Sequence, residues 1–92
     1  MERRLIPIAC TLSPLELRGR VERWRALRRL GWELADGRLD ARFAPEDAAE
    51  LADLASAERT CCGWAAWEVA GSDLVVTGDP DGIAAVAELL FA

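Results

Sequence analysis

Three cysteines carry most of the chemistry open to this 92-residue chain, because it contains no histidine, lysine or tyrosine. Cys10 follows a short apolar segment, whereas Cys61 and Cys62 are adjacent and precede Gly63. Thiolates are soft ligands that select Cu(I), Zn(II), mercuric ion or iron-sulfur chemistry over hard cations. Glu58 lies one helical turn before Cys62. If the three thiols meet, Glu58 would serve as an oxygen ligand or as a hydrogen-bond partner of the ligands. We therefore predict a soft-metal site (Hg, Cu or Zn) made by Cys10, Cys61, Cys62 and Glu58.

The ligand count argues against a structural zinc site, which normally has four Cys or His ligands. A two- or three-coordinate soft metal suits three thiolates better. The competing interpretation is structural, since free cysteine is among the most often buried residues. Neighbours on a helix point ~100° apart, so one of Cys61 and Cys62 would face the core. A helix C-terminus does not lower a thiol pKa, so activation would come from Arg59, another arginine or a metal.

Two further interpretations of the cysteines stay open. A thiol redox protein would pair Cys10 with Cys61 or Cys62, because a disulfide between neighbours closes a strained ring. An interaction module would dimerise or dock on a regulator and use the thiols as core filler. Enzyme chemistry is disfavoured: no histidine is present to activate a Ser or Cys nucleophile, and phosphate-loop and dinucleotide fingerprints are absent.

Size and composition indicate a single domain over residues 1–92. The chain is 52% apolar and 29% charged, which is typical of a globular protein. No apolar run approaches the ~18 residues of a membrane span, and the apolar segment that follows the first residues is too short for a signal peptide. An odd number of cysteines fits a reducing compartment. We expect a cytoplasmic protein without a membrane partner.

The charges are distributed unevenly along the chain. Residues 1–42 contain ten arginines and six acids, whereas the remainder contains only Arg59 against ten acids, giving a net charge of -5. The overall acidity and the lack of interleaved aromatic residues argue against nucleic-acid binding. The pattern instead favours a basic helix face that complements an acidic second half.

The hydrophobic pattern predicts seven elements in the order β-α-β-α-β-β-α. The helix that begins at Ser13-Pro14 carries a capping box with Glu16, and its end falls anywhere between Gly31 and Asp36-Gly37. The predicted elements are strand 5–12, this helix, strand 38–43, helix 45–62, strands 64–70 and 74–78 as a hairpin, and helix 80–91. This order implies an α/β (α+β) two-layer sandwich with a four-stranded mixed sheet and three helices.

Several segments resemble a group of small bacterial proteins, mostly actinobacterial. The similar segments are Ala9-Cys10-Thr11-Leu12 with Glu16, Trp24-Arg25-Ala26-Leu27, and Ala57-Glu58-Arg59-Thr60-Cys61-Cys62. Such domains occur alone or appended to MerR-type transcriptional regulators, sometimes near heavy-metal resistance genes. The chain departs from the pattern at Gly63-Trp64, where a proline and a phenylalanine are expected. The resemblance implies metal or thiol-stress handling, with a metal ion, a homodimer or a MerR-type regulator as partner.

Overall fold

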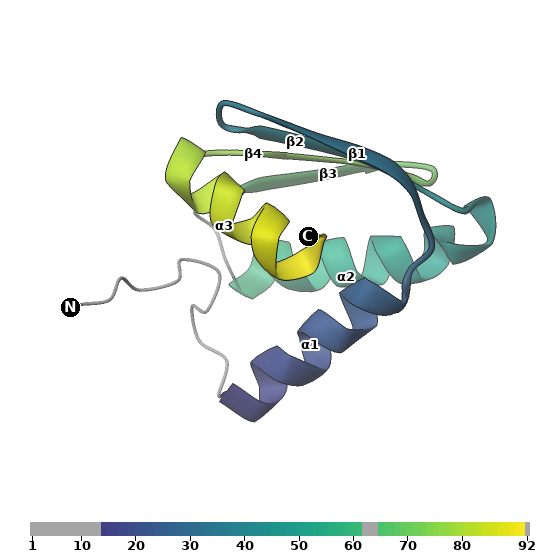
Figure 1. Ribbon diagram of the computed structural model, residues 1–92. Coiled ribbons are helices and arrows are strands. Elements are labelled where there is room, and N and C mark those ends of the chain that lie inside the picture. The colour runs from purple at the N-terminus through teal and green to yellow at the C-terminus, as the bar shows by residue number, and fades with distance from the viewer. Residues whose placement is uncertain (1–13, 62–64, 92) are drawn as a thin grey trace.

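The computed structural model describes residues 14–61 and 65–91 (Figure 1). These residues form a two-layer α/β sandwich, in which a four-stranded sheet is covered by helices on one face (Figure 1). The elements are α1 (Pro14–Ala26), β1 (Arg29–Ala35), β2 (Arg38–Phe43), the 3-10 turn η1 (Pro45–Asp47), α2 (Ala48–Cys61), β3 (Ala66–Ala70), β4 (Asp73–Thr77) and α3 (Pro80–Leu90). The predicted two-layer class with four strands and three helices is confirmed for this part of the chain.

The sheet is antiparallel rather than mixed, and its strand order is β1-β2-β4-β3. The described chain therefore runs α-β-β-α-β-β-α. Strand β1, residues 29–35, was not among the predicted strands. The sequence instead allowed these residues to continue the first helix. The predicted strand over residues 5–12 lies outside the described residues.

Strand β1 forms because the chain turns back at Asp36-Gly37. Gly37 has φ +78°, a left-handed conformation that suits glycine, and an Asp-Gly pair between alternating segments is a strong hairpin signal. Leu30 and Leu34 are four residues apart, so they fit one side of a strand as well as one face of a helix, whereas Trp32 between them fits only the strand. Antiparallel pairing with β2 decides between the two, with Trp32 opposite Ala41.

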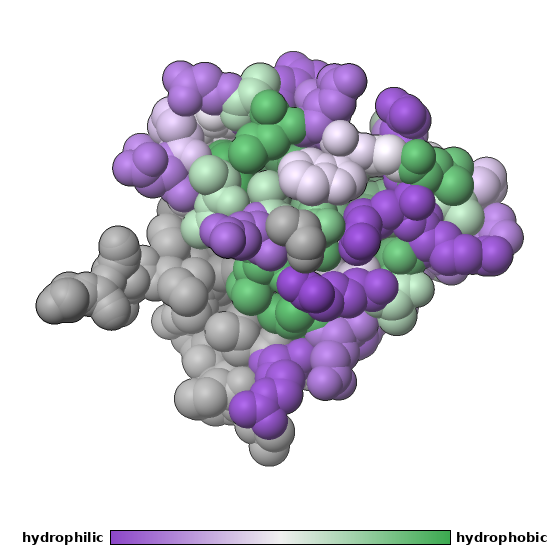
Figure 2. Space-filling model, viewed as in Figure 1, coloured by the Kyte–Doolittle hydropathy of each residue, from purple (hydrophilic) through white to green (hydrophobic). Residues whose placement is uncertain are grey.

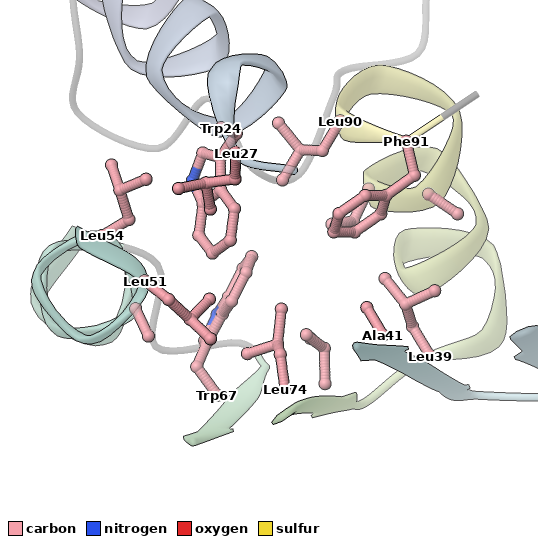
Figure 3. Packing of buried hydrophobic residues seen from close by; sticks show 14 of the residues in the cluster. Trp24, Leu27, Leu39, Ala41, Leu51, Leu54, Trp67, Leu74, Leu90 and Phe91 are labelled. Carbon is pink, nitrogen blue, oxygen red and sulfur yellow. The ribbon is translucent and has the colours of Figure 1, made fainter. Parts of the chain in front are cut away.

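The core lies between the sheet and the helices. Leu39, Ala41 and Phe43 of β2 point to the same face as Leu74 and Val76 of β4, and all are buried. Figure 3 shows the helix side of this core, where Trp24, Leu27, Leu51 and Leu54 meet Trp67, Leu90 and Phe91. The opposite face of the sheet carries no described helix and is lined by alternating polar residues such as Arg38, Asp40 and Glu68.

The chain repeats one arrangement, a hairpin followed by a helix that starts at a proline. Pro45 opens η1 before α2, and Pro80 opens α3, where Asp79 accepts a hydrogen bond from the amide of Gly82 at 3.2 Å. The two hairpins pair through β2 and β4, so β1 and β3 are the edges of the sheet that the described residues form.

Ion pairs join the basic first half to the acidic second half. They are Arg20–Glu58 at 3.0 Å, Arg23–Glu50 at 2.8 Å and Arg28–Glu46. Each joins an arginine in or just after α1 to an acid in η1 or α2. The complementarity predicted from the charge distribution is thereby confirmed.

Candidate functional site

Two of the four predicted metal ligands lie among the described residues. Glu58 lies in the last turn of α2, and Cys61 is the final residue of that helix. Cys10 and Cys62 lie outside the described residues. Among the described residues, no group of three or more His, Cys, Asp or Glu side chains is arranged to hold a metal ion.

Glu58 is the only charged residue that is buried in the described part of the chain, with 5% of its surface exposed. Its Oε2 atom accepts hydrogen bonds from Arg20 Nη1 at 3.0 Å and from Trp24 Nε1 at 3.1 Å. Both donors lie in α1, four residues apart, so they project from the same side of that helix. The carboxylate thus joins α1 to the last turn of α2, immediately before Cys61.

Aromatic rings surround this buried polar contact. The Trp24 ring centroid is 5.8 Å from that of Trp67 and 6.3 Å from that of Phe91. Figure 3 shows Trp24 and Trp67 facing one another beside Leu51 and Leu54 of α2. The apolar surroundings strengthen the hydrogen bonds of Glu58, because they keep water away from the carboxylate.

Trp67 differs from Trp24 in the hydrogen bonding of its indole N–H. Its side chain is buried, yet its Nε1 atom has no hydrogen-bond partner within the described part of the structure. A buried donor without an acceptor costs ~1–3 kcal/mol. Both tryptophans are core residues, but only Trp24 has its indole N–H satisfied.

Arg59, suggested from the sequence as a thiol activator, is engaged elsewhere. Its Nε atom donates a 2.7 Å hydrogen bond to the backbone carbonyl of Trp67. This contact joins the last turn of α2 to strand β3. The described structure therefore gives Arg59 a role in holding β3 against α2.

The sequence interpretation missed Arg20 and Trp24 as partners of Glu58. A signal was present, since an arginine and a tryptophan four residues apart place a charge at the margin of an apolar helix face. The acid that they meet is 34 and 38 residues further along the chain.

None of the described helices has the length and apolar character needed to span a membrane. Comparisons with models of protein families, with curated proteins and with solved structures find no match to this chain.

Proposed function

We propose that this protein binds a soft metal ion, mercuric ion in the first instance, through the thiolates of Cys10, Cys61 and Cys62. The supporting observation is the burial of Glu58, three residues before Cys61. Burying a carboxylate is costly unless it is paired and hydrogen-bonded, as Glu58 is with Arg20 and Trp24. Glu58 lies in the last turn of α2, which ends at Cys61, and Cys62 follows in the sequence.

Glu58 serves in this proposal as a positioning residue. Two hydrogen bonds to Oε2 hold the carboxylate against α1 and thereby fix the final turn of α2. Partners of this kind orient the ligands of a metal site, and their loss typically weakens metal binding about 10–100-fold. The thiolates themselves supply the affinity for Hg(II), Cu(I) or Zn(II).

The proposed setting is the cytoplasm, where thiols stay reduced and available to a metal. The metal-bound form would act as a sensor or carrier, and a MerR-type regulator would be its protein partner. Thiol redox chemistry of Cys10 with Cys61 or Cys62 is the alternative use of the same residues.

The test is native mass spectrometry of the reduced, full-length protein with Hg(II), Cu(I) or Zn(II), in the presence of a competing small thiol. Four proteins are compared: wild type, the double variant Cys61→Ser/Cys62→Ser, Glu58→Gln and Glu50→Gln. Glu50 is the matched control, because it lies in the same helix and also pairs with an arginine of α1, but in an exposed position. Circular dichroism verifies that each variant is folded.

The wild type should carry one metal ion, and the double serine variant should carry none. Glu58→Gln should keep the stoichiometry but bind about 10–100-fold more weakly, whereas Glu50→Gln should match the wild type. If no ion survives the competing thiol, metal binding is rejected. A free-thiol count that changes between oxidising and reducing buffers would then favour the redox alternative. Equal affinities of Glu58→Gln and Glu50→Gln would remove Glu58 from the site.

A further inference from the structure

Strand β1 presents an apolar stripe at one edge of the sheet. Leu30, Trp32 and Leu34 are 64%, 38% and 45% exposed, and they are the large hydrophobic residues that the described structure leaves exposed. Trp32 and Leu34 pair with Ala41 and Leu39, so they lie on the helix-covered face of the sheet. Figure 2 shows apolar surface between charged groups on the side of the molecule where β1 and α3 lie. Exposed apolar residues gathered on one edge strand indicate an interaction surface.

The two edges of the sheet differ in how far other described elements cover their backbone. At β3 the carbonyl of Trp67 accepts a hydrogen bond from Arg59, and α2 packs against the strand. At β1, no described side chain or neighbouring element hydrogen-bonds to the backbone of residues 30–35 from outside the sheet. An edge strand without such cover is ready to pair with another strand. Within residues 14–61 and 65–91, β3 is covered in part by α2 and Arg59, whereas residues 30–35 of β1 have no such cover.

The uncovered face of the sheet adds a charge pattern to the same edge. Gly31 pairs with Arg42 of β2, and Arg42 Nη2 lies 2.8 Å from the position that a Cβ atom on residue 31 would take. The guanidinium therefore lies over β1 at Gly31, where the absence of a side chain leaves room for it. Glu33 follows two residues later on the same face. A positive and a negative group thus lie next to each other along the edge.

We propose that two copies of this chain associate by antiparallel pairing of their β1 strands about a two-fold axis at Trp32. This register pairs Trp32 with the partner's Trp32. It also brings Leu30, which lies at a register irregularity between Arg29 and Gly31, next to the partner's Leu34. On the other face it sets Gly31, and the Arg42 guanidinium above it, opposite the partner's Glu33. Each pairing occurs twice, as an isologous interface requires. The result is a continuous eight-stranded sheet with the helices of both copies on the same side.

Charge selects this register over its neighbours. A two-fold axis at Glu33 would place Glu33 against the partner's Glu33, and like charges directly opposite are destabilising. An axis at Gly31 would bring the two Arg42 guanidinium groups together. The axis at Trp32 is the one of the three that gives opposite charges on one face and apolar pairs on the other.

The helix-covered face also provides a place for the most exposed side chain of the stripe. A shallow hollow lies beside Leu34, and it is lined by Pro80 and Ala84 of α3 together with Asp36 and Asp81. In the proposed register the partner's Leu30 lies next to Leu34, at the margin of this hollow.

Pairing along one seven-residue strand forms a smaller interface than the ~1,600 Å² of a standard stable complex, so the dimer should be concentration-dependent. The experiment is sedimentation equilibrium of the reduced full-length protein from about 1 µM to about 500 µM. The variants are Arg42→Glu, Glu33→Arg, an equimolar mixture of these two, and Leu30→Arg. The control is Glu68→Arg, which reverses a charge on the same face of the sheet but at the other edge strand. Urea unfolding at low concentration checks that each chain is folded.

The wild type and Glu68→Arg should dimerise alike. Arg42→Glu and Glu33→Arg should each dimerise at least about tenfold more weakly, because each homodimer contains two like-charge pairs. In the mixture, every Arg–Glu contact is restored in the heterodimer, so association should return to the wild-type level. Leu30→Arg should also weaken association, because it removes the apolar pair with the partner's Leu34.

A wild type that stays monomeric over the whole range overturns the proposal and leaves another chain or another segment of this one as the occupant of the edge. A dimer that tolerates both single charge reversals, or a mixture that does not recover, overturns the register. If a charge variant fails to fold, a dimer that is unaffected by Leu30→Arg overturns the apolar pairing. None of these results depends on metal binding, so this proposal and the proposed function can fail separately.

Discussion

Trp24 donates its indole N–H to Glu58 across 3.1 Å, although 34 residues separate them in the chain. The same Glu58 oxygen accepts a hydrogen bond from Arg20, so one buried atom joins two residues of α1 to the last turn of α2. This contact lies at the edge of the apolar core. It couples the packing of α1 to the helix end at which Cys61 stands.

Removing the Glu58 carboxylate should destabilise the protein strongly. Glu58→Ala leaves Trp24 without its acceptor and Arg20 without its buried counter-charge, and breaking a buried pair in this way costs about 3–5 kcal/mol. Glu58→Gln, which retains an acceptor oxygen, should lose less. Urea unfolding, monitored by tryptophan fluorescence, measures the free energy of unfolding of both variants.

The matched control for this prediction is Glu50→Ala. Glu50 also pairs with an α1 arginine, but its side chain is 41% exposed, so the loss should stay below about 1 kcal/mol. Equal losses for Glu58→Ala and Glu50→Ala would show that burial adds nothing to the Glu58 contact.

The two core tryptophans should respond differently to the same substitution. Trp24→Phe and Trp67→Phe remove similar volumes from the core, but only Trp24 has a hydrogen bond to lose. We expect Trp24→Phe to be more destabilising by about 1–2 kcal/mol, because the lost bond is made to a charged acceptor. The difference between the two free energies of unfolding gives the value. A larger loss for Trp67→Phe would contradict the assignment of its Nε1 atom as unsatisfied.

Alanine should be tolerated unequally at the two hairpin glycines. Gly37 and Gly71 have φ +78° and +64°, so either substitution forces a side chain into a left-handed conformation at ~1–2 kcal/mol. At residue 37 the new Cβ would also lie 2.8 Å from the backbone oxygen of Gly78, whereas nothing lies within 4 Å at residue 71. Gly37→Ala should therefore lower the thermal midpoint more than Gly71→Ala. A similar drop for both would indicate that backbone strain alone determines the cost.

Acid should weaken the exposed ion pairs. The hydrogen bond from Arg38 lowers the pKa of Asp40, and that from Arg23 lowers the pKa of Glu50. Because folding lowers both values, the pairs stabilise the protein above the ordinary carboxyl pKa and lose this contribution as pH falls through the lowered value. The loss should therefore begin below about pH 4.

Urea midpoints between pH 7 and pH 3 measure this dependence. Asp40→Asn should remove part of the fall at low pH, and so should Glu50→Gln. Both effects should be small, because water screens pairs that are this exposed. A variant with the full wild-type pH dependence would exclude its ion pair as a source.

Local sequence was sufficient for much of the fold. Alternation of apolar and charged residues predicted the strand at residues 38–43, and Asp79-Pro80 predicted the start of α3. These signals are local, because they depend on side-chain period and on the fixed φ of proline.

Residues 29–35 were not decided in this way. Leu30 and Leu34 are four apart, which places them on one side of a helix and also on one side of a strand. The choice depends on pairing with β2, a contact between segments joined by the Asp36-Gly37 turn. The direction of the sheet follows from the same hairpin.

The sequence by itself determined which residues could do chemistry: three thiols, a carboxylate near two of them, and no histidine. It also determined that the basic first half and the acidic second half would complement each other. Only the tertiary structure decided which acid is buried and which arginine meets it. Those outcomes depend on atoms that lie tens of residues apart in the chain and come within hydrogen-bond distance only when α1 and α2 pack on the sheet.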